Sequence, residues 1–109
     1  MREAALNKKV KDWINTIPGA WAYKRLGSVG NKGMPDVSGH IRAVRIELEG
    51  KLPGEKPTPK QAYFIAKFQA DGVIAGWYTS LEEAQQIVVT QAAWHGIHLE
   101  QVGRIWRIK

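Results

Sequence analysis

Two acids and a lysine in the first half of the chain are of the residue types that build hydrolytic metal sites. Asp36 follows a proline, and Glu49 and Lys51 stand two residues apart further along the chain. Mg²⁺ prefers oxygen ligands and is commonly held by one or two carboxylates together with substrate phosphate. A nearby lysine can hold a phosphate oxygen or orient a water molecule. If the fold brings these three residues together, they predict metal-assisted hydrolysis of a phosphodiester bond.

The pattern of residues 36–50 predicts the β-hairpin that would bring them together. Apolar and charged side chains alternate from residue 44 to residue 49, which is the period of a strand with one buried face. A two-residue turn at 42–43 then places Asp36 opposite Glu49, and Lys51 lies two residues further along the same face. A slip of one residue would turn the apolar set to solvent, so this register is favoured. Directly opposed carboxylates repel each other, and a divalent cation would compensate them.

The rest of the chain predicts an α/β fold with a mixed central β-sheet flanked by helices, in one domain over residues 1–109. The helices are indicated by apolar residues at helical spacing, by capping boxes that begin at Thr58 and Ser80, and by stop signals at Pro18 and Gly72. The expected order is αβββαβα followed by a short strand. We expect helices over 2–17, from the cap at 58 to about 71, and over 81–94, and strands over 20–26, 36–50 (the hairpin), 73–78 and near Ile105 and Ile108.

Composition and charge restrict the class of protein. The chain has 109 residues, 44% of them hydrophobic, no cysteine, and a formal net charge of +6. Such a basic chain favours a polyanionic partner, and nucleic acid is favoured over membrane because no expected helix is both strongly apolar on one face and basic on the other. No apolar run approaches the ~20 residues of a membrane span, and the N-terminal segment lacks the pattern of a secretory signal. We therefore expect a cytoplasmic protein without disulfides or thiolate zinc sites.

The same residues carry a resemblance to a known superfamily of nucleases. Pro35-Asp36, then Glu49-Gly50-Lys51, then Gln61 at a helix start follow one another in the order of the PD-(D/E)XK motif. The stretch GMPDVSGHIRAVRIELEGKLPGEKPTPKQ resembles the VRR-NUC (virus-type replication-repair nuclease) branch of that superfamily. MREAAL and YKRLGS are also similar to segments of phage members. The resemblance covers most of the chain and implies a restriction-endonuclease-like core.

The resemblance implies a role for each motif residue. Asp36 and Glu49 would ligate the metal ion, and the backbone carbonyl of Gly50 would be a further ligand. Lys51 would position the attacking water, and Gln61 would orient the site from the start of its helix. The implied cofactor is Mg²⁺ or Mn²⁺.

Three further assignments have competing explanations. The resemblance implies that Glu3, in the first helix, contributes to the metal site, although an acid in a first helical turn also favours the helix dipole. Gln61 can serve only the capping box. Glu47 lies on the same face as Glu49, and as the motif acid it would leave Glu49 in the lysine position. Glu49 is therefore preferred, with Glu47 as an extra ligand or as a neighbour that supports the ligands.

Basic residues beside the expected site are candidates for DNA contact. Lys24, Arg25 and Lys32 border the glycine-rich loop, and Lys56 and Lys60 border the proline-rich loop. Their other explanation is an ordinary solvated surface. We expect His40, His95 and His98 at the surface and the five tryptophans mostly in the core, with at most one exposed tryptophan stacking on unpaired bases.

The activity implied by the resemblance is structure-selective cleavage of DNA, at four-way junctions or other branched DNA. Symmetric cutting of two DNA strands needs two active sites, so a homodimer is implied. The apolar tail around Ile105, Trp106 and Ile108 is a candidate dimer surface. The resemblance to phage members implies a protein of a phage-infected or prophage-bearing bacterium. The alternative is a non-catalytic nucleic-acid-binding module on a nuclease scaffold, which the presence of all three motif residues disfavours.

Overall fold

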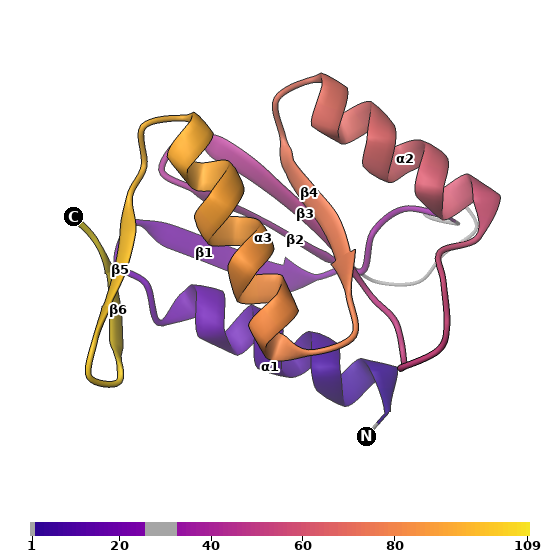
Figure 1. The fold of residues 1–109 in the computed structure, drawn as a ribbon, viewed down its shortest axis with the longest axis horizontal. Helices are drawn as coiled ribbons and strands as arrows, with labels where there is room; N and C mark the ends of the chain where they lie inside the picture. The colour runs from indigo at the N-terminus through magenta and orange to yellow at the C-terminus, as the bar shows by residue number, and fades with distance from the viewer. Residues whose placement is uncertain (1, 26–32) are drawn as a thin grey trace.

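The computed structural model describes residues 2–25 and 33–109, and it confirms the predicted mixed α/β class (Figure 1). Three helices and six strands follow one another within these residues. In chain order they are α1 (Glu3–Asn15), β1 (Ala20–Lys24), β2 (Val37–Ile41), β3 (Val44–Gly50), α2 (Pro59–Ala70), β4 (Ile74–Tyr78), α3 (Leu81–Trp94), β5 (Leu99–Val102) and β6 (Ile105–Ile108).

Local sequence signals explain where the helices begin and end. The capping box of α2 is confirmed: the Gln61 backbone N–H donates to Thr58 Oγ1 at 3.2 Å, and the Thr58 N–H donates to Gln61 Oε1 at 2.9 Å. Gly72, with a φ of 83°, stands directly after the cap that closes this helix. α1 ends at Asn15, two residues earlier than predicted, because Pro18 restricts the residue before it to extended conformations. Within residues 2–25 and 33–109, no helix combines the length and the apolar character needed to cross a membrane.

The first four strands form one sheet in the order β1-β2-β3-β4. The pairs β1–β2 and β2–β3 are antiparallel, and β3–β4 is parallel. The predicted hairpin register is confirmed, since Ile41 pairs with Val44 and Val37 pairs with Leu48. Asp36 and Glu49 lie immediately beyond the last of these pairs.

The helices divide between the two faces of the sheet. α1 and α3 pack against one face and against each other, as Figure 1 shows, and they enclose the core around Val10, Ile14, Ile46, Leu48 and Val88. α2 packs on the opposite face over β3 and β4. The charged side chains of β3 share this opposite face with α2, whose Phe68 ring lies 4.7 Å from the Arg45 guanidinium carbon.

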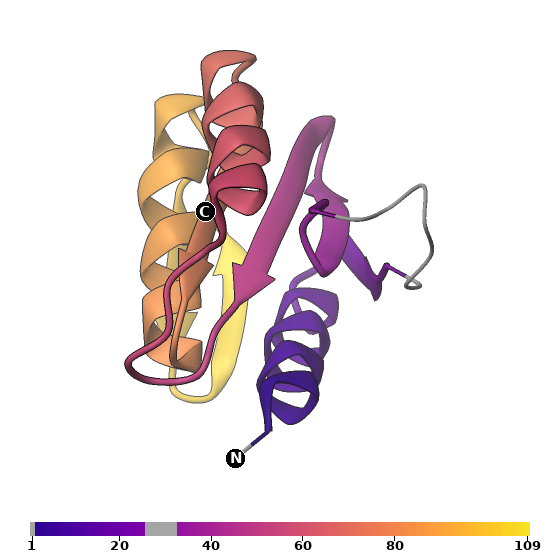
Figure 2. The same ribbon diagram turned by 90° about the vertical axis from the view of Figure 1, so that its right-hand side faces the viewer.

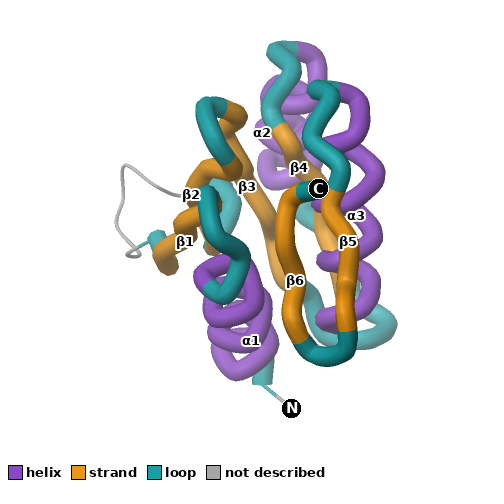
Figure 3. Tube along the Cα trace, turned by 90° about the vertical axis from the view of Figure 1, so that its left-hand side faces the viewer, coloured by secondary structure: helices purple, strands orange, loops and turns teal. Residues whose placement is uncertain are grey.

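The C-terminal tail corrects one prediction. It forms a two-stranded antiparallel hairpin of β5 and β6 instead of a single strand, and Figure 3 shows this hairpin beside α3. Gly103, with a φ of 63°, makes the tight two-residue turn that reverses the chain. Trp106 packs edge-to-face on Trp13 at 5.3 Å, so the predicted candidate for a dimer surface is partly used by the chain's own core.

The expectation that the tryptophans lie mostly in the core is wrong. Trp21 is 52% exposed, and Trp77 and Trp94 are exposed as well. Trp21 points to the α2 face of an edge strand, and Trp94 lies at the last turn of α3. Their types predicted burial, but their positions leave their side chains in solvent.

Amide side chains occupy both edges of the four-stranded sheet. On β1, Asn15 donates to the Ala22 carbonyl and accepts from the Ala22 N–H, each at 2.9 Å. On β4, Gln91 makes the same two bonds with Ala75, also at 2.9 Å. Each amide therefore takes the hydrogen-bonding positions that a further strand would use.

Candidate metal centre

Three carboxylates meet where β2 begins and β3 ends. Glu3 comes from the first turn of α1, Asp36 precedes β2, and Glu49 stands next to the last residue of β3. One carboxylate oxygen from each residue lies within 4.8 Å of the oxygens of the other two. Asp36 and Glu49 were predicted to meet from the hairpin register, and Glu3 joins them because α1 packs across the sheet with its N-terminus at this end.

Glu49 is buried without a hydrogen-bond partner. Its side chain is 1% exposed, and neither carboxylate oxygen has a partner among the described residues. Burial first, and then the neighbouring Asp36 carboxyl, raises the pKa of Glu49 to about 9, while the charge of Lys51 acts in the opposite direction. A buried carboxyl group without a hydrogen-bond donor is costly to ionise.

These acids fit a hard divalent cation. A cation held between Glu3, Asp36 and Glu49 would give the buried Glu49 a direct partner, in addition to the nearby charge of Lys51. The donors are all carboxylate oxygens, which is the ligand chemistry of Mg²⁺ and Mn²⁺. The pKa of Glu3 is also raised, first by burial and then by Asp36.

Lys51 lies beside the acids at the entrance to the loop after β3. Its side chain is mostly buried, and its charge opposes the rise in the pKa of both Glu3 and Glu49. Its backbone N–H donates to the Tyr78 carbonyl at 2.9 Å, which continues the β3–β4 pairing past Gly50. Figure 2 shows the loop between β3 and α2 at the same end of the molecule as the N-terminus. The ammonium group is thus held close to the cluster by the sheet.

Asn7 is a site residue that the sequence reasoning missed. It is buried on α1, one turn after Glu3, and its side-chain N–H₂ donates to Asp36 Oδ2 at 3.0 Å. Its carbonyl oxygen accepts the Tyr78 hydroxyl at 2.8 Å. Burial, followed by the charges of Asp36 and Glu49, raises the pKa of Tyr78, so this hydroxyl stays a donor. The chain Tyr78–Asn7–Asp36 fixes one oxygen of the aspartate.

The same contact explains why residue 50 is a glycine. A Cβ at Gly50 would collide with Asn7 Oδ1 and lie 3.2 Å from Tyr78 Cε2. The amide of Asn7 therefore occupies the space of a side chain at this position of β3. The role predicted for the Gly50 carbonyl as a metal ligand stays a prediction, although Gly50 is next to Glu49 and belongs to the same strand end.

Glu47 lies outside the acid cluster, and basic and hydroxyl groups satisfy it. It accepts from Ser38 Oγ at 2.6 Å, from Arg25 Nη2 at 3.0 Å and from Arg45 Nε at 2.7 Å. Arg25 is further fixed by donating to the Pro35 carbonyl at 3.1 Å. Two glutamates on one strand face therefore differ sharply: Glu47 is neutralised by the protein and Glu49 is not. The guanidinium of Arg25, predicted to contact DNA, is turned to this internal network.

The other predicted residues that the structure describes do not belong to the cluster of three acids. The side chain of Gln61 is engaged in the capping box of α2. Lys24 and Lys56 are exposed, and Lys60 packs against Gly33, where a Cβ would lie 2.6 Å from Lys60 Cγ. Lys32 lies outside the described residues. The three histidines are exposed as predicted: His40 on β2, His95 at the cap of α3, and His98 after it.

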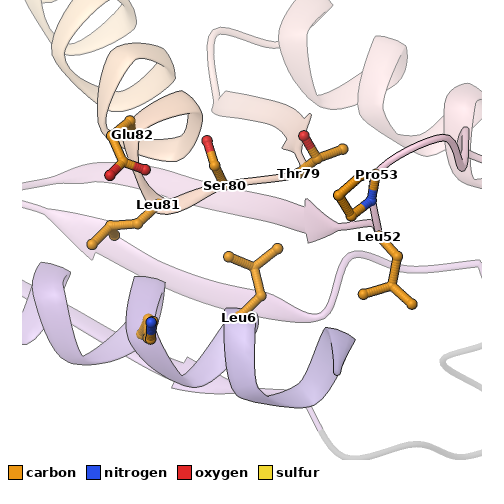
Figure 4. A pocket seen from close by; sticks show the side chains of 8 residues that line it. Leu6, Leu52, Pro53, Thr79, Ser80, Leu81 and Glu82 are labelled. Atoms are coloured by element: carbon orange, nitrogen blue, oxygen red, sulfur yellow. The ribbon is translucent and has the colours of Figure 1, made fainter. Parts of the chain in front are cut away.

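A cleft of about 300 Å³ lies between α1, the loop after β3 and the start of α3 (Figure 4). Its lining is mostly apolar and includes Leu6, Leu52, Pro53 and Leu81. None of the clustered acids lines it. This cleft is therefore distinct from the candidate metal centre, although Leu52 directly follows Lys51.

Comparison with known proteins supports the fold. The chain is similar to a solved structure described as a VRR_NUC domain, with a TM-score of 0.65 and 24% sequence identity. The match covers 79% of this chain and 92% of that one. No protein-family model matches the sequence, and no curated protein matches it. The chain has a VRR-NUC-like fold, so the predicted resemblance and fold class are confirmed at the level of structure.

Proposed function

We propose that this chain is a divalent-metal-dependent nuclease domain that hydrolyses phosphodiester bonds in DNA. The observation that carries the proposal is Glu49, a buried carboxyl without a partner that lies beside Glu3, Asp36 and the ammonium of Lys51. The basic charge of the chain and the VRR-NUC-like fold support a nucleic acid as the substrate.

Each residue has a definite task in this proposal. Asp36 and Glu49, with Glu3, would hold Mg²⁺ or Mn²⁺, and Asn7 keeps one oxygen of Asp36 in place. When bound, the ion would stabilise the negative charge that develops on the phosphate oxygens.

Lys51 acts on the reacting groups directly. Its ammonium group holds a phosphate oxygen and orients the water that attacks phosphorus in line. A bond forms between phosphorus and the water oxygen, and the opposite P–O ester bond breaks. The attacking water releases one proton to solvent, and the leaving oxygen receives one proton from solvent.

The substrate is proposed to be branched or otherwise structured DNA, as the resemblance to VRR-NUC domains implies. A single chain supplies one metal centre, so symmetric cutting of two strands would require two copies.

The test incubates the purified chain with labelled four-way junction, flap, single-stranded and duplex DNA, with Mg²⁺, with Mn²⁺ or with EDTA. We expect cleavage only with the metal ion, and a loss of at least about a hundredfold in Asp36→Asn, Glu49→Gln and Lys51→Ala. Asp71→Asn, an exposed acid after α2, is the matched control and should cleave as the parent does. Binding without cleavage by the parent would instead identify a non-catalytic module and refute the proposal.

A further inference from the structure

Two aromatic side chains stand in solvent on the edge strand β1. Trp21 is 52% exposed and Tyr23 is 43% exposed, and their ring centroids lie 5.0 Å apart. The exposed ring of His40, on the neighbouring strand, lies 6.0 Å from Trp21. We call Trp21, Tyr23 and His40 the aromatic surface. Large aromatic groups usually contribute to cores or to interfaces, so a cluster of them in water indicates a binding surface.

The fold explains why this surface is open. Trp21, Tyr23 and His40 point to the same face of the sheet as Arg45, because Trp21 pairs with His40 and His40 pairs with Arg45. α2 packs on that face over β3 and β4. The rings on β1 and β2 therefore lie beside α2 and remain exposed.

The charge around the aromatic surface is positive. Arg25 and Arg45 lie on the same sheet face as the rings, where their two guanidinium groups share one carboxylate, that of Glu47. Glu47, the nearest carboxylate on β3, is buried and neutralised by Arg25 and Arg45. Aromatic rings on a face where two guanidinium groups outnumber one carboxylate match a ligand that carries both flat rings and negative charge, which is the chemistry of unpaired nucleotides.

The aromatic surface leads directly to the candidate metal centre. The Arg25 N–H donates to the Asp36 carbonyl at 2.7 Å, so the end of β1 lies against the aspartate. Tyr23 and Trp21 stand two and four residues back along β1 from Arg25. At about 3.3 Å per residue, these rings lie roughly 7 and 13 Å along the strand from the level of Asp36.

We propose that the aromatic surface stacks unpaired bases of the DNA and so directs the adjoining phosphate to the metal centre. The inference rests on the proposed function and narrows its substrate to DNA with unpaired nucleotides, such as flaps and splayed arms. Stacking accepts every base, so the preference is for structure and not for sequence.

A second copy of the chain fits this surface less well than DNA. Each copy has a net charge of +6, and the cations around the rings would repel one another. Asn15 already occupies the N–H and carbonyl of Ala22 at the centre of β1, so pairing of two β1 strands is obstructed.

The experiment measures DNA binding in EDTA, where no cleavage occurs, by fluorescence anisotropy at one salt concentration. Labelled single-stranded, flap and blunt duplex DNA are compared for the parent and for the double variant Trp21→Thr, Tyr23→Thr. Threonine keeps strand propensity while it removes the rings. Trp94→Ala is the matched control, because Trp94 is 72% exposed on α3, outside the aromatic surface. The double variant Trp21→Phe, Tyr23→Phe retains two rings.

We expect the threonine variant to lose at least about tenfold in affinity for single-stranded and flap DNA, and less than about twofold for blunt duplex. The phenylalanine variant and Trp94→Ala should bind as the parent does. Equal loss on all three DNAs, or no loss in the threonine variant, would overturn the inference. So would a dimer, seen by analytical ultracentrifugation, that the threonine variant converts to monomer. Binding is measured without metal, so the two proposals can fail separately. A chain that binds flap DNA through these rings but cleaves no DNA when Mg²⁺ or Mn²⁺ is added would refute the proposed function and leave the stacking inference intact.

Discussion

Neutralising Glu49 should make the metal-free protein more stable and remove most of its sensitivity to pH. Glu49 is buried without a donor, and its pKa is raised from 4.5 to about 9, mainly by burial. Between these two values the folded protein holds a proton that the unfolded chain has lost. Folding therefore becomes less favourable as the pH rises through this window, and the stability is fully present only below about 4.5. Glu49→Gln has nothing to ionise and escapes this loss.

The size of the effect follows from proton linkage. One proton bound only by the folded state changes the free energy of unfolding by about 1.4 kcal/mol for each pH unit. From about pH 6 to about pH 8 the parent should lose up to about 3 kcal/mol more than Glu49→Gln does. The variant should be the more stable protein at pH 8. Glu3, whose pKa is also raised, is present in both proteins.

Urea unfolding at several pH values, followed by far-UV circular dichroism in EDTA, measures this difference. Glu47→Gln is the matched control, since Glu47 is equally buried on the same face of β3 but is paired with Arg25 and Arg45. Removing its charge leaves two guanidinium groups without their partner and should cost about 3 kcal/mol. A Glu49→Gln variant that is destabilised to the same extent as Glu47→Gln would show that Glu49 is satisfied in the protein, and the reasoning for a metal centre would fail.

Three further results follow from the site. Gly50→Ala should lower the melting temperature and the activity, because the new Cβ collides with Asn7. Asn7→Ala alone should cost about 1–3 kcal/mol, because it leaves the Tyr78 hydroxyl unpaired. In the double variant, Asn7→Ala should restore part of the stability that Gly50→Ala loses, which a double-mutant cycle measures. Mn²⁺ at about a hundred times its dissociation constant should stabilise the parent by about 2.7 kcal/mol in thermal unfolding, and Asp36→Asn should abolish this gain. Thr58→Ala should lower the free energy of unfolding by about 1 kcal/mol, because it removes the side-chain cap of α2. Nearly full activity in the folded variant would show that this cap is not needed for catalysis.

The hairpin could be predicted from the sequence because the alternation of apolar and charged residues and the burial of one sheet face require the same register. The alternation from residue 44 to residue 49 specifies which side chains are buried, and a one-residue slip would expose Ile46 and Leu48. Asp36 and Glu49 then meet as a consequence of the register. Glu3 could be assigned only from the resemblance, because nothing in its local sequence tells where α1 crosses the sheet.

Long-range packing decided what the sequence could not show. Asn7 sits among charged residues of α1 and has the type of a solvent-facing residue, yet it is buried between Asp36 and Tyr78. The glycine at position 50 is likewise explained only by the fold, because the amide of Asn7 occupies the space that a Cβ would need there. The terminal hairpin did have a local signal, the glycine of the turn at Gly103, which was overlooked because the strands on either side are short.

The amide side chains at the two edges of the sheet have a consequence for self-association. Exposed edge strands are the usual starting points for aggregation, because their free N–H and carbonyl groups can template another chain. Here Asn15 and Gln91 act as substitutes for a neighbouring peptide group, at Ala22 on one side and at Ala75 on the other. In the proposed function, which gathers basic chains along DNA, these two amides would oppose pairing of the chains through their sheet edges.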